Sequence, residues 1–154
     1  MFDSTWGTSM KPPVIYGLCP LIQVYDMPVS LAFYRGLLGF QIVQQSSPGD
    51  DCDWVWLKRG AAELMVNTMY ESDSRPAKPD DGRNHHHSDT GLFITTPDVE
   101  AMYAFLRHHG IAVEPPVVTP YGMKQLHLKD PDGYGICFQW TAAEQRRQSE
   151  PSMT

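Results

Sequence analysis

The sequence has few of the features that mark several large protein classes. Its 154 residues include only three cysteines, none in a Cys-x-x-Cys pair. No apolar run approaches the roughly 18–20 residues of a transmembrane helix. Positive charge is scarce, with 12 Lys and Arg against 18 Asp and Glu, and the net charge of −6 argues against a partner held by phosphate contacts. We therefore expect neither a membrane span nor a nucleic-acid partner.

Other missing features concern the cell compartment and the chemistry. No charged start is followed by an apolar segment and a small-residue cleavage site, so we expect a cytoplasmic protein. Three cysteines favour free thiols in a reducing compartment, with a Cys19–Cys137 disulfide as the alternative. The sequence also shows no phosphate-binding loop and no Ser-His-Asp arrangement. We therefore expect neither a nucleotide-binding enzyme with a phosphate loop nor a hydrolase with a Ser-His-Asp triad.

What the sequence does contain is an internal repeat. Residues 23–43 and 95–114 both read as a strand, an acidic turn, a helix, a glycine and a second strand. Asp26 and Asp98 are the equivalent residues before the two helices, where an aspartate can accept hydrogen bonds from the first turn. A repeat of this size predicts two modules that are each too small to bury a core alone and therefore pack together.

The apolar pattern gives each copy the order β-α-β-β-β, which predicts an α+β fold with curved, mixed half-barrel sheets around a cleft. In the first copy, strands are predicted over 14–24, with a break at Gly17–Pro20, and over 40–45, 53–58 and 61–67. A helix is predicted over 26–38, with the apolar face Val29, Ala32, Phe33 and Leu37. In the second copy, strands are predicted over 91–96, 111–116, 123–130 and 134–140, with a helix over 98–109. The predicted divisions are an N-terminal arm (1–13), a first module (14–70), a linker (71–90), a second module (91–140) and a polar C-terminal tail (141–154).

Successive strand residues point to opposite faces, and this separates core residues from cleft residues. In the strand over 61–67, Leu64 and Val66 share the apolar face, and Glu63 lies on the other face. In the last strand, Cys137 and Gln139 lie on the more polar face. We expect the helices to cover the apolar faces and the polar faces to line the cleft.

Several residues are predicted to contact a small molecule in that cleft: Trp54, Trp56, Glu63, Tyr121, Gln125, His127 and Gln139. Trp54 and Trp56 share one strand face and form either a stacking wall for a planar ligand or part of the core. Glu63 is a partner for a cationic ligand or a catalytic carboxylate, and His127 is a candidate acid or base. Tyr121 lies in a loop between Pro120 and Gly122, where it could gate the cleft.

The paired modules carry two recognisable stretches, DMPVSLAFYRGLLGF in the first copy and DPDGYGICF in the second. Together with the segments at 59–67 and 98–110, they resemble the vicinal oxygen chelate superfamily, which includes glyoxalase I, bleomycin-resistance proteins and extradiol dioxygenases. The resemblance covers roughly residues 18–140. It implies modules packed around a deep cleft, commonly in a homodimer.

The resemblance also implies where a divalent metal (Ni, Zn, Fe or Mn) would bind, because the enzymes hold it on the first and last strand of each module. Here those positions carry Cys19, Glu63, Gly91 and Cys137. Only Glu63 matches the family's His, Glu or Gln ligands, and Gly91 has no side chain. His87 precedes Gly91 and is the candidate replacement, although the run His85–His87 is otherwise expected to be a solvated linker.

Two functions follow as expectations. The first is a metal-free binder of a planar or cationic drug or metabolite, similar to bleomycin-resistance proteins, with no cofactor. The alternative is a lyase or dioxygenase of the glyoxalase I or extradiol type, in which Cys19, Glu63, His87 and Cys137 would hold a divalent metal. In both, the partner is a small molecule, and the resemblance favours a homodimer.

Overall fold

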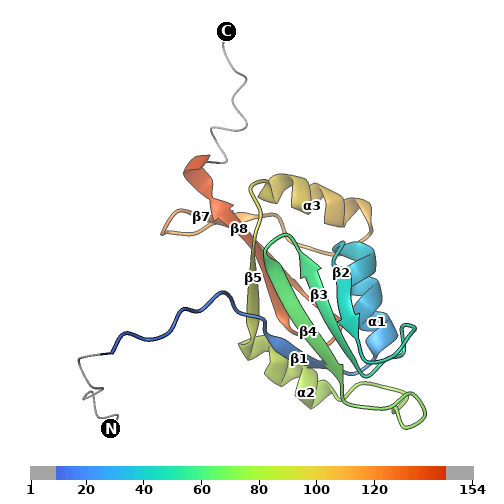
Figure 1. Cartoon of the computed structure of the whole chain (residues 1–154). Helices are drawn as coiled ribbons and strands as arrows, with labels where there is room; N and C mark the ends of the chain where they lie inside the picture. Colours follow the sequence, from blue (N-terminus) through green and yellow to red (C-terminus); the bar gives the residue numbers. More distant parts are fainter. Residues whose placement is uncertain (1–9, 145–154) are drawn as a thin grey trace.

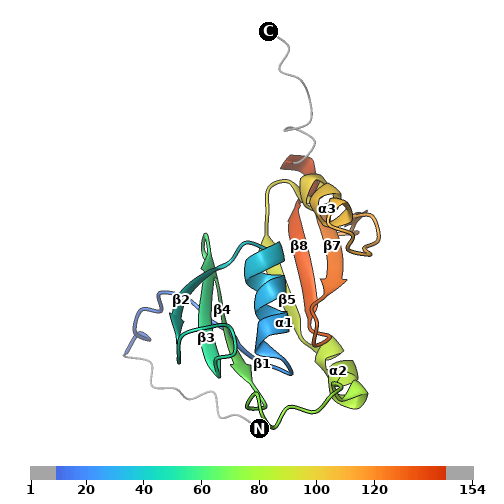
Figure 2. The same cartoon turned by 90° about the vertical axis from the view of Figure 1, so that its right-hand side faces the viewer.

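The computed structural model of the chain describes residues 10–144, so the predictions for residues 1–9 and 145–154 lie outside the described part. Two four-stranded sheets form its frame (Figures 1 and 2). The first contains β1 (Leu21–Val24), β2 (Gln41–Gln45), β3 (Trp54–Arg59) and β4 (Ala62–Thr68), in the order β1-β4-β3-β2. The second contains β5 (Gly91–Thr95), β6 (Val117–Val118), β7 (Met123–Lys129) and β8 (Gly135–Thr141), in the order β5-β8-β7-β6.

The two sheets have the same pairing pattern. The first strand of each module runs parallel to the last one, β1 to β4 and β5 to β8, and the other neighbours are antiparallel. Neither sheet closes on itself, so each keeps two edge strands. The predicted α+β fold of two β-α-β-β-β modules is thereby confirmed, with open mixed sheets rather than a closed barrel.

The helices begin and end where the sequence provides caps. They are α1 (Met27–Leu31), which continues as the π-helix η1 (Ala32–Leu37), α2 (Asp81–His86), the 3₁₀-helix η2 (His87–Asp89) and α3 (Val99–His108). The side chain of Asp26 accepts a hydrogen bond from the Val29 amide, and Asp98 accepts one from Ala101. Gly39 and Gly110 follow the two long helices with φ near +75°, the left-handed conformation that glycine adopts without strain.

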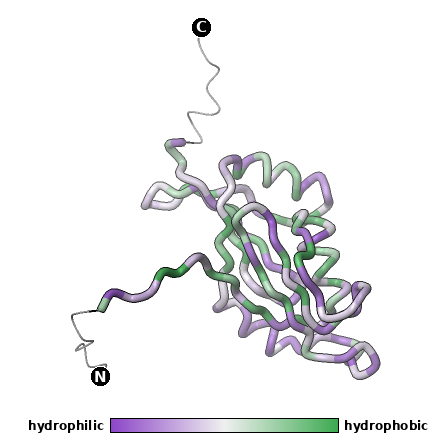
Figure 3. Tube along the Cα trace, in the orientation of Figure 1, coloured by the Kyte–Doolittle hydropathy of each residue, from purple (hydrophilic) through white to green (hydrophobic). Residues whose placement is uncertain are grey.

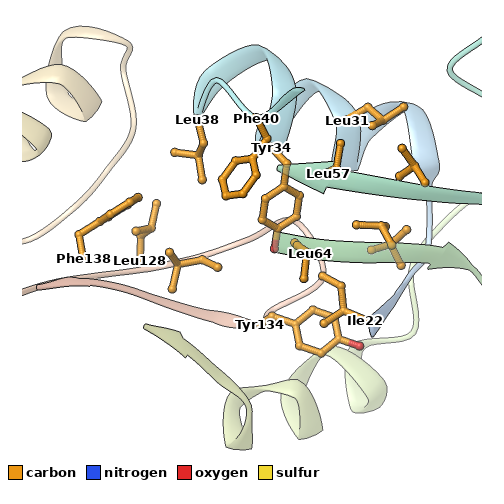
Figure 4. Close-up of a cluster of buried hydrophobic side chains, with 14 of the residues drawn as sticks. Ile22, Leu31, Tyr34, Leu38, Phe40, Leu57, Leu64, Leu128, Tyr134 and Phe138 are labelled. Atoms are coloured by element: carbon orange, nitrogen blue, oxygen red, sulfur yellow. The ribbon is translucent and has the colours of Figure 1, made fainter. Parts of the chain in front are cut away.

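A single hydrophobic core joins both modules (Figure 4). It contains Leu57 and Leu64 from the first sheet, Tyr34 and Leu38 from the first helix, and Phe138 from the second sheet. Each of these side chains is at most 3 % exposed. The core therefore takes the apolar faces of both sheets, and the polar faces point away from it.

The first helix buries a different face from the one predicted. Its buried residues are Met27, Ser30, Leu31, Tyr34 and Leu38, whereas Val29 is 49 % exposed and Ala32 is also exposed. The π-helical turn, with Leu38 N–H donating to the Phe33 carbonyl, widens the last turn. The helix also contacts the second module, a contact that its own apolar pattern does not reveal.

Two further predictions about the elements were wrong. Residues 14–16 form no strand, and pairing begins only at Leu21, after the predicted break at Gly17–Pro20, in which Pro20 lacks an N–H for a ladder. Residues 111–116 are irregular, and β6 starts directly after Pro115-Pro116, in a segment predicted to be a loop. The segment predicted as a linker, 71–90, contains α2 and η2.

Two buried aspartates of the β7–β8 turn connect the modules. Asp130 accepts hydrogen bonds from the Tyr34 hydroxyl (2.7 Å) and from the Asp132 and Tyr134 amides. Asp132 accepts hydrogen bonds from the Tyr25 amide (2.6 Å) and the Ser30 hydroxyl (3.4 Å). Through these contacts, the turn between the last two strands fixes the start of the first helix.

Candidate functional site

The polar face of the second sheet carries a connected group of side chains. The Nε2 amide of Gln125 donates to the Tyr121 hydroxyl (3.3 Å) and to Gln139 Oε1 (3.0 Å). Gln125 Oε1 lies 3.2 Å from His127 Nε2, which in turn lies 3.9 Å from the Cys137 sulfur. The structure therefore brings together the predicted residues Tyr121, Gln125, His127 and Gln139 on one surface.

The members of this group differ in exposure, which determines what a ligand could reach. Gln125 and Cys137 are buried at 5 % and 2 %, whereas Tyr121 is 71 % exposed and His127 is also exposed. Burial raises the pKa of the Cys137 thiol, so it is protonated at neutral pH. The accessible groups are the His127 imidazole and the Tyr121 phenol, supported from beneath by the two glutamines.

The polar face of the first sheet carries the aromatic residues. Val55 and Leu57 are fully buried in the core, so Trp54 and Trp56 lie on the opposite face, where they are half-buried. Across the ladder, Trp54 pairs with Asn67 and Trp56 with Met65. Both tryptophans therefore lie outside the core beneath the helix. The Trp56 indole N–H is buried and has no acceptor among the described residues.

Glu63 lies on the same face as the tryptophans, at the start of β4. Its carboxylate is 3.9 Å from Lys58 Nζ, and its side chain is 23 % exposed. Cys19, which precedes β1, lies close enough for the charge of Glu63 to contribute, after burial, to a raised pKa of its thiol. Glu63 thus combines a partly accessible negative charge with two indole rings on one sheet face.

The four predicted metal ligands do not form one group within a chain. Among residues 10–144 there is no cluster of three or more His, Cys, Asp or Glu side chains that could hold a metal ion. His87 is turned elsewhere, because its Nδ1 lies 2.6 Å from the Asp132 carbonyl and its ring stacks on Tyr134 at 4.0 Å. The described residues of one chain therefore do not fit a four-ligand metal site, and we derive no step through a metal. All three cysteines, Cys19 and Cys137 included, are free.

Some features of the site region were missed by sequence reasoning. The burial of Asp130 and Asp132 was not expected, since the segment reads as an ordinary hairpin turn. The sequence signal that could have indicated this burial is the pair Asp130 and Asp132 close to Tyr134 in the turn. The role of Arg75 was also missed, although it is paired with both Asp26 and Asp51 and holds the loop after β4 against the first helix.

The sequence profile of the Glyoxalase/Bleomycin resistance protein/Dioxygenase superfamily matches residues 18–138. The chain belongs to this superfamily. No protein of curated function matches the chain in sequence. The predicted family is confirmed, and the match covers both modules and the linker between them.

Solved structures share the fold. A glyoxalase/bleomycin resistance protein from Streptomyces sp. CB03234 is 25 % identical, with 81 % of this chain and 100 % of that chain covered and a TM-score of 0.57. A glyoxalase family protein from Enterococcus faecalis is 25 % identical, with 82 % and 97 % covered and a TM-score of 0.56. The antibiotic binding protein TnmS3, also from Streptomyces sp. CB03234, is 24 % identical, with 85 % and 99 % covered and a TM-score of 0.62. In the part of the chain that the structure describes, no helix is long and apolar enough to cross a membrane.

Proposed function

We propose that this protein binds a planar, cationic small organic molecule as a metal-free cytoplasmic homodimer and lowers its free concentration by sequestration. The observation that carries the proposal is the face of the first sheet, where Trp54, Trp56 and Glu63 lie together outside the core. Indole rings offer flat surfaces for stacking and for cation–π contacts, and a carboxylate favours positive charge. The net charge of −6 acts in the same direction.

The second sheet supplies the groups that would orient such a molecule. Gln125 is held by hydrogen bonds to Tyr121 and Gln139, so its position beneath the surface is fixed before a ligand arrives. His127 and Tyr121 then present a ring nitrogen and a hydroxyl to solvent. A similar fold in the antibiotic binding protein TnmS3 supports small-molecule binding as the use of this scaffold here.

The alternative is a divalent-metal lyase or dioxygenase. One observation favours it: Cys19 and Glu63 lie close together at two of the positions where the resemblance places metal ligands. The alternative would assign Glu63 or His127 to proton transfer. It remains second because Gly91 supplies no ligand and His87 is engaged with Asp132 and Tyr134.

The decisive experiment uses the protein without an affinity tag. Metal content is measured by mass spectrometry, and proflavine, a planar aromatic cation, is titrated by calorimetry. We expect saturable binding without stoichiometric metal, weakened by about tenfold or more in Trp56→Ala and Glu63→Gln. Trp140→Phe is the matched control, because Trp140 lies on the core side of β8.

Two results would reject the proposal. The first is proflavine binding that is absent or that is unaffected by both Trp56→Ala and Glu63→Gln. The second is one divalent ion bound per chain and lost in Glu63→Ala, which would establish the metal-dependent alternative instead.

A further inference from the structure

A cavity beside β7 has no part in the ligand site proposed above. It has a volume of about 490 Å³ and lies between β7, the end of α3 and the segment that follows α3. Its walls are Arg107, residues 111–114 and residues 127–129. Figure 2 shows α3 and β7 at this end of the second sheet, where the two elements are in contact. Small-molecule pockets in proteins span roughly 300–1,000 Å³, so the cavity is large enough for a ligand of metabolite size.

The cavity lies along an edge of β7 that has no partner strand. β6 covers only the start of β7, through the pairs Val117–Gln125 and Val118–Lys124. Beyond these pairs, the described part of the chain places no strand on this side of β7, and residues 111–116 are irregular. An unpaired strand edge presents backbone N–H groups, which are additional donors for a ligand with anionic oxygens.

The charged side chains around the cavity are mostly basic. Arg107 comes from the last turn of α3, which is hydrophilic in Figure 3, and His127 and Lys129 come from β7. Glu114 is the acidic residue in the same walls. All four residues are exposed, so their charged groups are accessible to a ligand. Three basic residues against one carboxylate favour an anion, in a chain whose net charge is −6.

Arg107 and Lys129 also differ from most other basic residues in having no partner. Residues 10–144 contain ten lysines and arginines, and six of these are held by a carboxylate or a backbone carbonyl: Arg35, Lys58, Arg59, Arg75, Arg83 and Lys124. The four others have no ion pair or hydrogen bond within the described ranges, and they are Lys11, Lys78, Arg107 and Lys129. Two of these four unpaired cations therefore line the same cavity.

The imidazole of His127 is held in place at the cavity wall. The side-chain amide of Gln125 donates to both Tyr121 and Gln139, so its oxygen accepts from His127 Nε2 at 3.2 Å. The other ring nitrogen, Nδ1, has no partner among residues 10–144. An imidazolium donates from both ring nitrogens, so a bound anion can accept a hydrogen bond from Nδ1. The ring is oriented before a ligand arrives, which lowers the entropic cost of binding.

We propose that this cavity binds a small organic anion, either a phosphate monoester or a dicarboxylate. The Arg107 guanidinium matches two oxygens of such a group, and Lys129 adds a second positive charge. The half-buried Ile111 and the buried Val113 supply apolar wall for the organic part of the ligand. The charge of this ligand is opposite to that of the cation proposed for the first sheet, so the two sites accept different molecules.

Separate surface roles for the same residues explain less of the structure. A basic residue in the last turn of a helix interacts favourably with the helix dipole, which accounts for Arg107 alone. An exposed lysine on an edge strand discourages pairing with other chains, which accounts for Lys129 alone. Neither role explains why both lie without partners around one cavity, beside an imidazole that the glutamine holds.

The first test is calorimetric titration of the full chain, without proflavine, with phenyl phosphate and with phthalate. We expect saturable binding of at least one probe, weakened about tenfold in Arg107→Gln and in Lys129→Gln. Glu114→Gln should strengthen binding about threefold, because it removes the repelling carboxylate. Lys78→Gln is the matched control, since Lys78 is an unpaired, exposed cation outside the cavity. Tighter binding of phenyl phosphate or of phthalate identifies the phosphate monoester or the dicarboxylate, respectively.

Two results of this titration would overturn the proposal. One is the absence of binding for both probes up to about 10 mM. The other is binding that Lys78→Gln weakens as much as Arg107→Gln and Lys129→Gln do, since that would indicate attraction by overall charge alone. Because the cation site is not titrated in this experiment, neither result bears on the proposed function.

The second test locates the anion on the natural chain and needs no variant. Lysines are acetylated with an N-hydroxysuccinimide ester, with and without the probe that binds more tightly, and the modified positions are quantified by mass spectrometry. We expect the probe to slow acetylation of Lys129 severalfold and to leave Lys78 unchanged. Equal rates at Lys129 with and without the probe would exclude it from the cavity and overturn the proposal.

Discussion

The hydroxyl of Tyr34 donates a 2.7 Å hydrogen bond to Asp130 Oδ2, across 96 positions of sequence. Both side chains are buried, at 1 % and 5 % exposure. This bond joins the first helix to the β7–β8 turn and therefore ties the first module to the second. The relative placement of the two sheets, and of the polar faces they carry, depends on this contact and its neighbours.

Replacing Tyr34 with phenylalanine tests this connection. Tyr34→Phe removes one donor from a buried carboxylate and leaves the ring in place, so we expect a loss of about 1–3 kcal/mol in the free energy of unfolding. Urea denaturation followed by circular dichroism measures the change. Tyr121→Phe is the control and should stay within about 0.5 kcal/mol, because Tyr121 is exposed. Equal effects of the two substitutions would contradict a connecting role for Tyr34.

The carboxyl of Asp132 should make stability depend on pH. Burial raises its pKa above the usual value of 3.8, and the neighbouring Asp130 also raises it, whereas the Tyr25 amide, Arg83 and His87 act in the opposite direction. A raised pKa means that the folded state holds the proton more tightly than the unfolded state. The contribution of Asp132 is therefore greatest at acid pH and is lost as the pH rises from 3.8 through the raised pKa.

Asp132→Asn removes this titration with little change of shape. The asparagine oxygen still accepts from the Tyr25 amide, and the Ser30 hydroxyl can accept from the new amide. We expect the free energy of unfolding of the variant, relative to the natural chain, to increase as the pH is raised from 4 to 7. Denaturation series at several pH values give this difference, and a difference that is constant or decreasing with pH would reject the raised pKa.

Position 133 needs glycine for two reasons, its backbone conformation and the lack of space for a side chain. Its φ is +84°, and a Cβ atom at this position would lie 2.5 Å from the Asn84 carbonyl oxygen of α2. We expect Gly133→Ala to cost more than the roughly 1–2 kcal/mol of a left-handed alanine alone. Gly60→Ala is the matched control, since Gly60 also has a positive φ but has nothing within 4 Å. Thermal unfolding of both variants should separate the two effects, and equal losses would show that α2 does not pack tightly on the turn.

Arg75 and Arg35 form ion pairs of different exposure. Arg75 contacts Asp26 and Asp51 with a side chain that is 16 % exposed, whereas Arg35 and Asp50 are 40 % and 49 % exposed. We expect Arg75→Gln to cost about 1–2 kcal/mol and Arg35→Gln less than about 1 kcal/mol. Unfolding in low and high salt measures both. A larger loss of stability in Arg35→Gln than in Arg75→Gln would show that exposure does not determine how much these ion pairs stabilise the fold.

Much of the fold could be predicted from the sequence because it rests on local rules. Asp26 and Asp98 cap the two helices as expected, and the alternation in β4 and β8 separates core from polar residues as predicted. The strand predicted over 111–116 does not form, and pairing starts only at β6, directly after the two prolines that end the segment. The helix face was misassigned because Tyr34 is buried by the other module, a contact that no local pattern contains.

The predicted residues of the second sheet lie together in the structure, whereas the predicted metal ligands do not. Tyr121, Gln125, His127 and Gln139 share a face because they occupy alternate positions on neighbouring strands or an adjoining loop. His87 was expected beside the metal position on the basis of distance along the chain. The structure instead stacks it on Tyr134, because α2 and η2 turn the linker toward the β7–β8 hairpin.

The sequence by itself determined the duplicated modules, the family and the separation of each strand into an apolar and a polar side, because caps, glycines and period-two alternation act over a few residues. Only the tertiary structure decided that both apolar faces share one core, that Trp54 and Trp56 lie outside it, and that Leu18 lines one cavity with residues 91–94 of β5. These outcomes depend on packing between segments that are distant in sequence. For example, Asp130 accepts a hydrogen bond from Tyr34, and Asp132 accepts one from the Tyr25 amide. A residue's own neighbours in sequence carry no information about such partners.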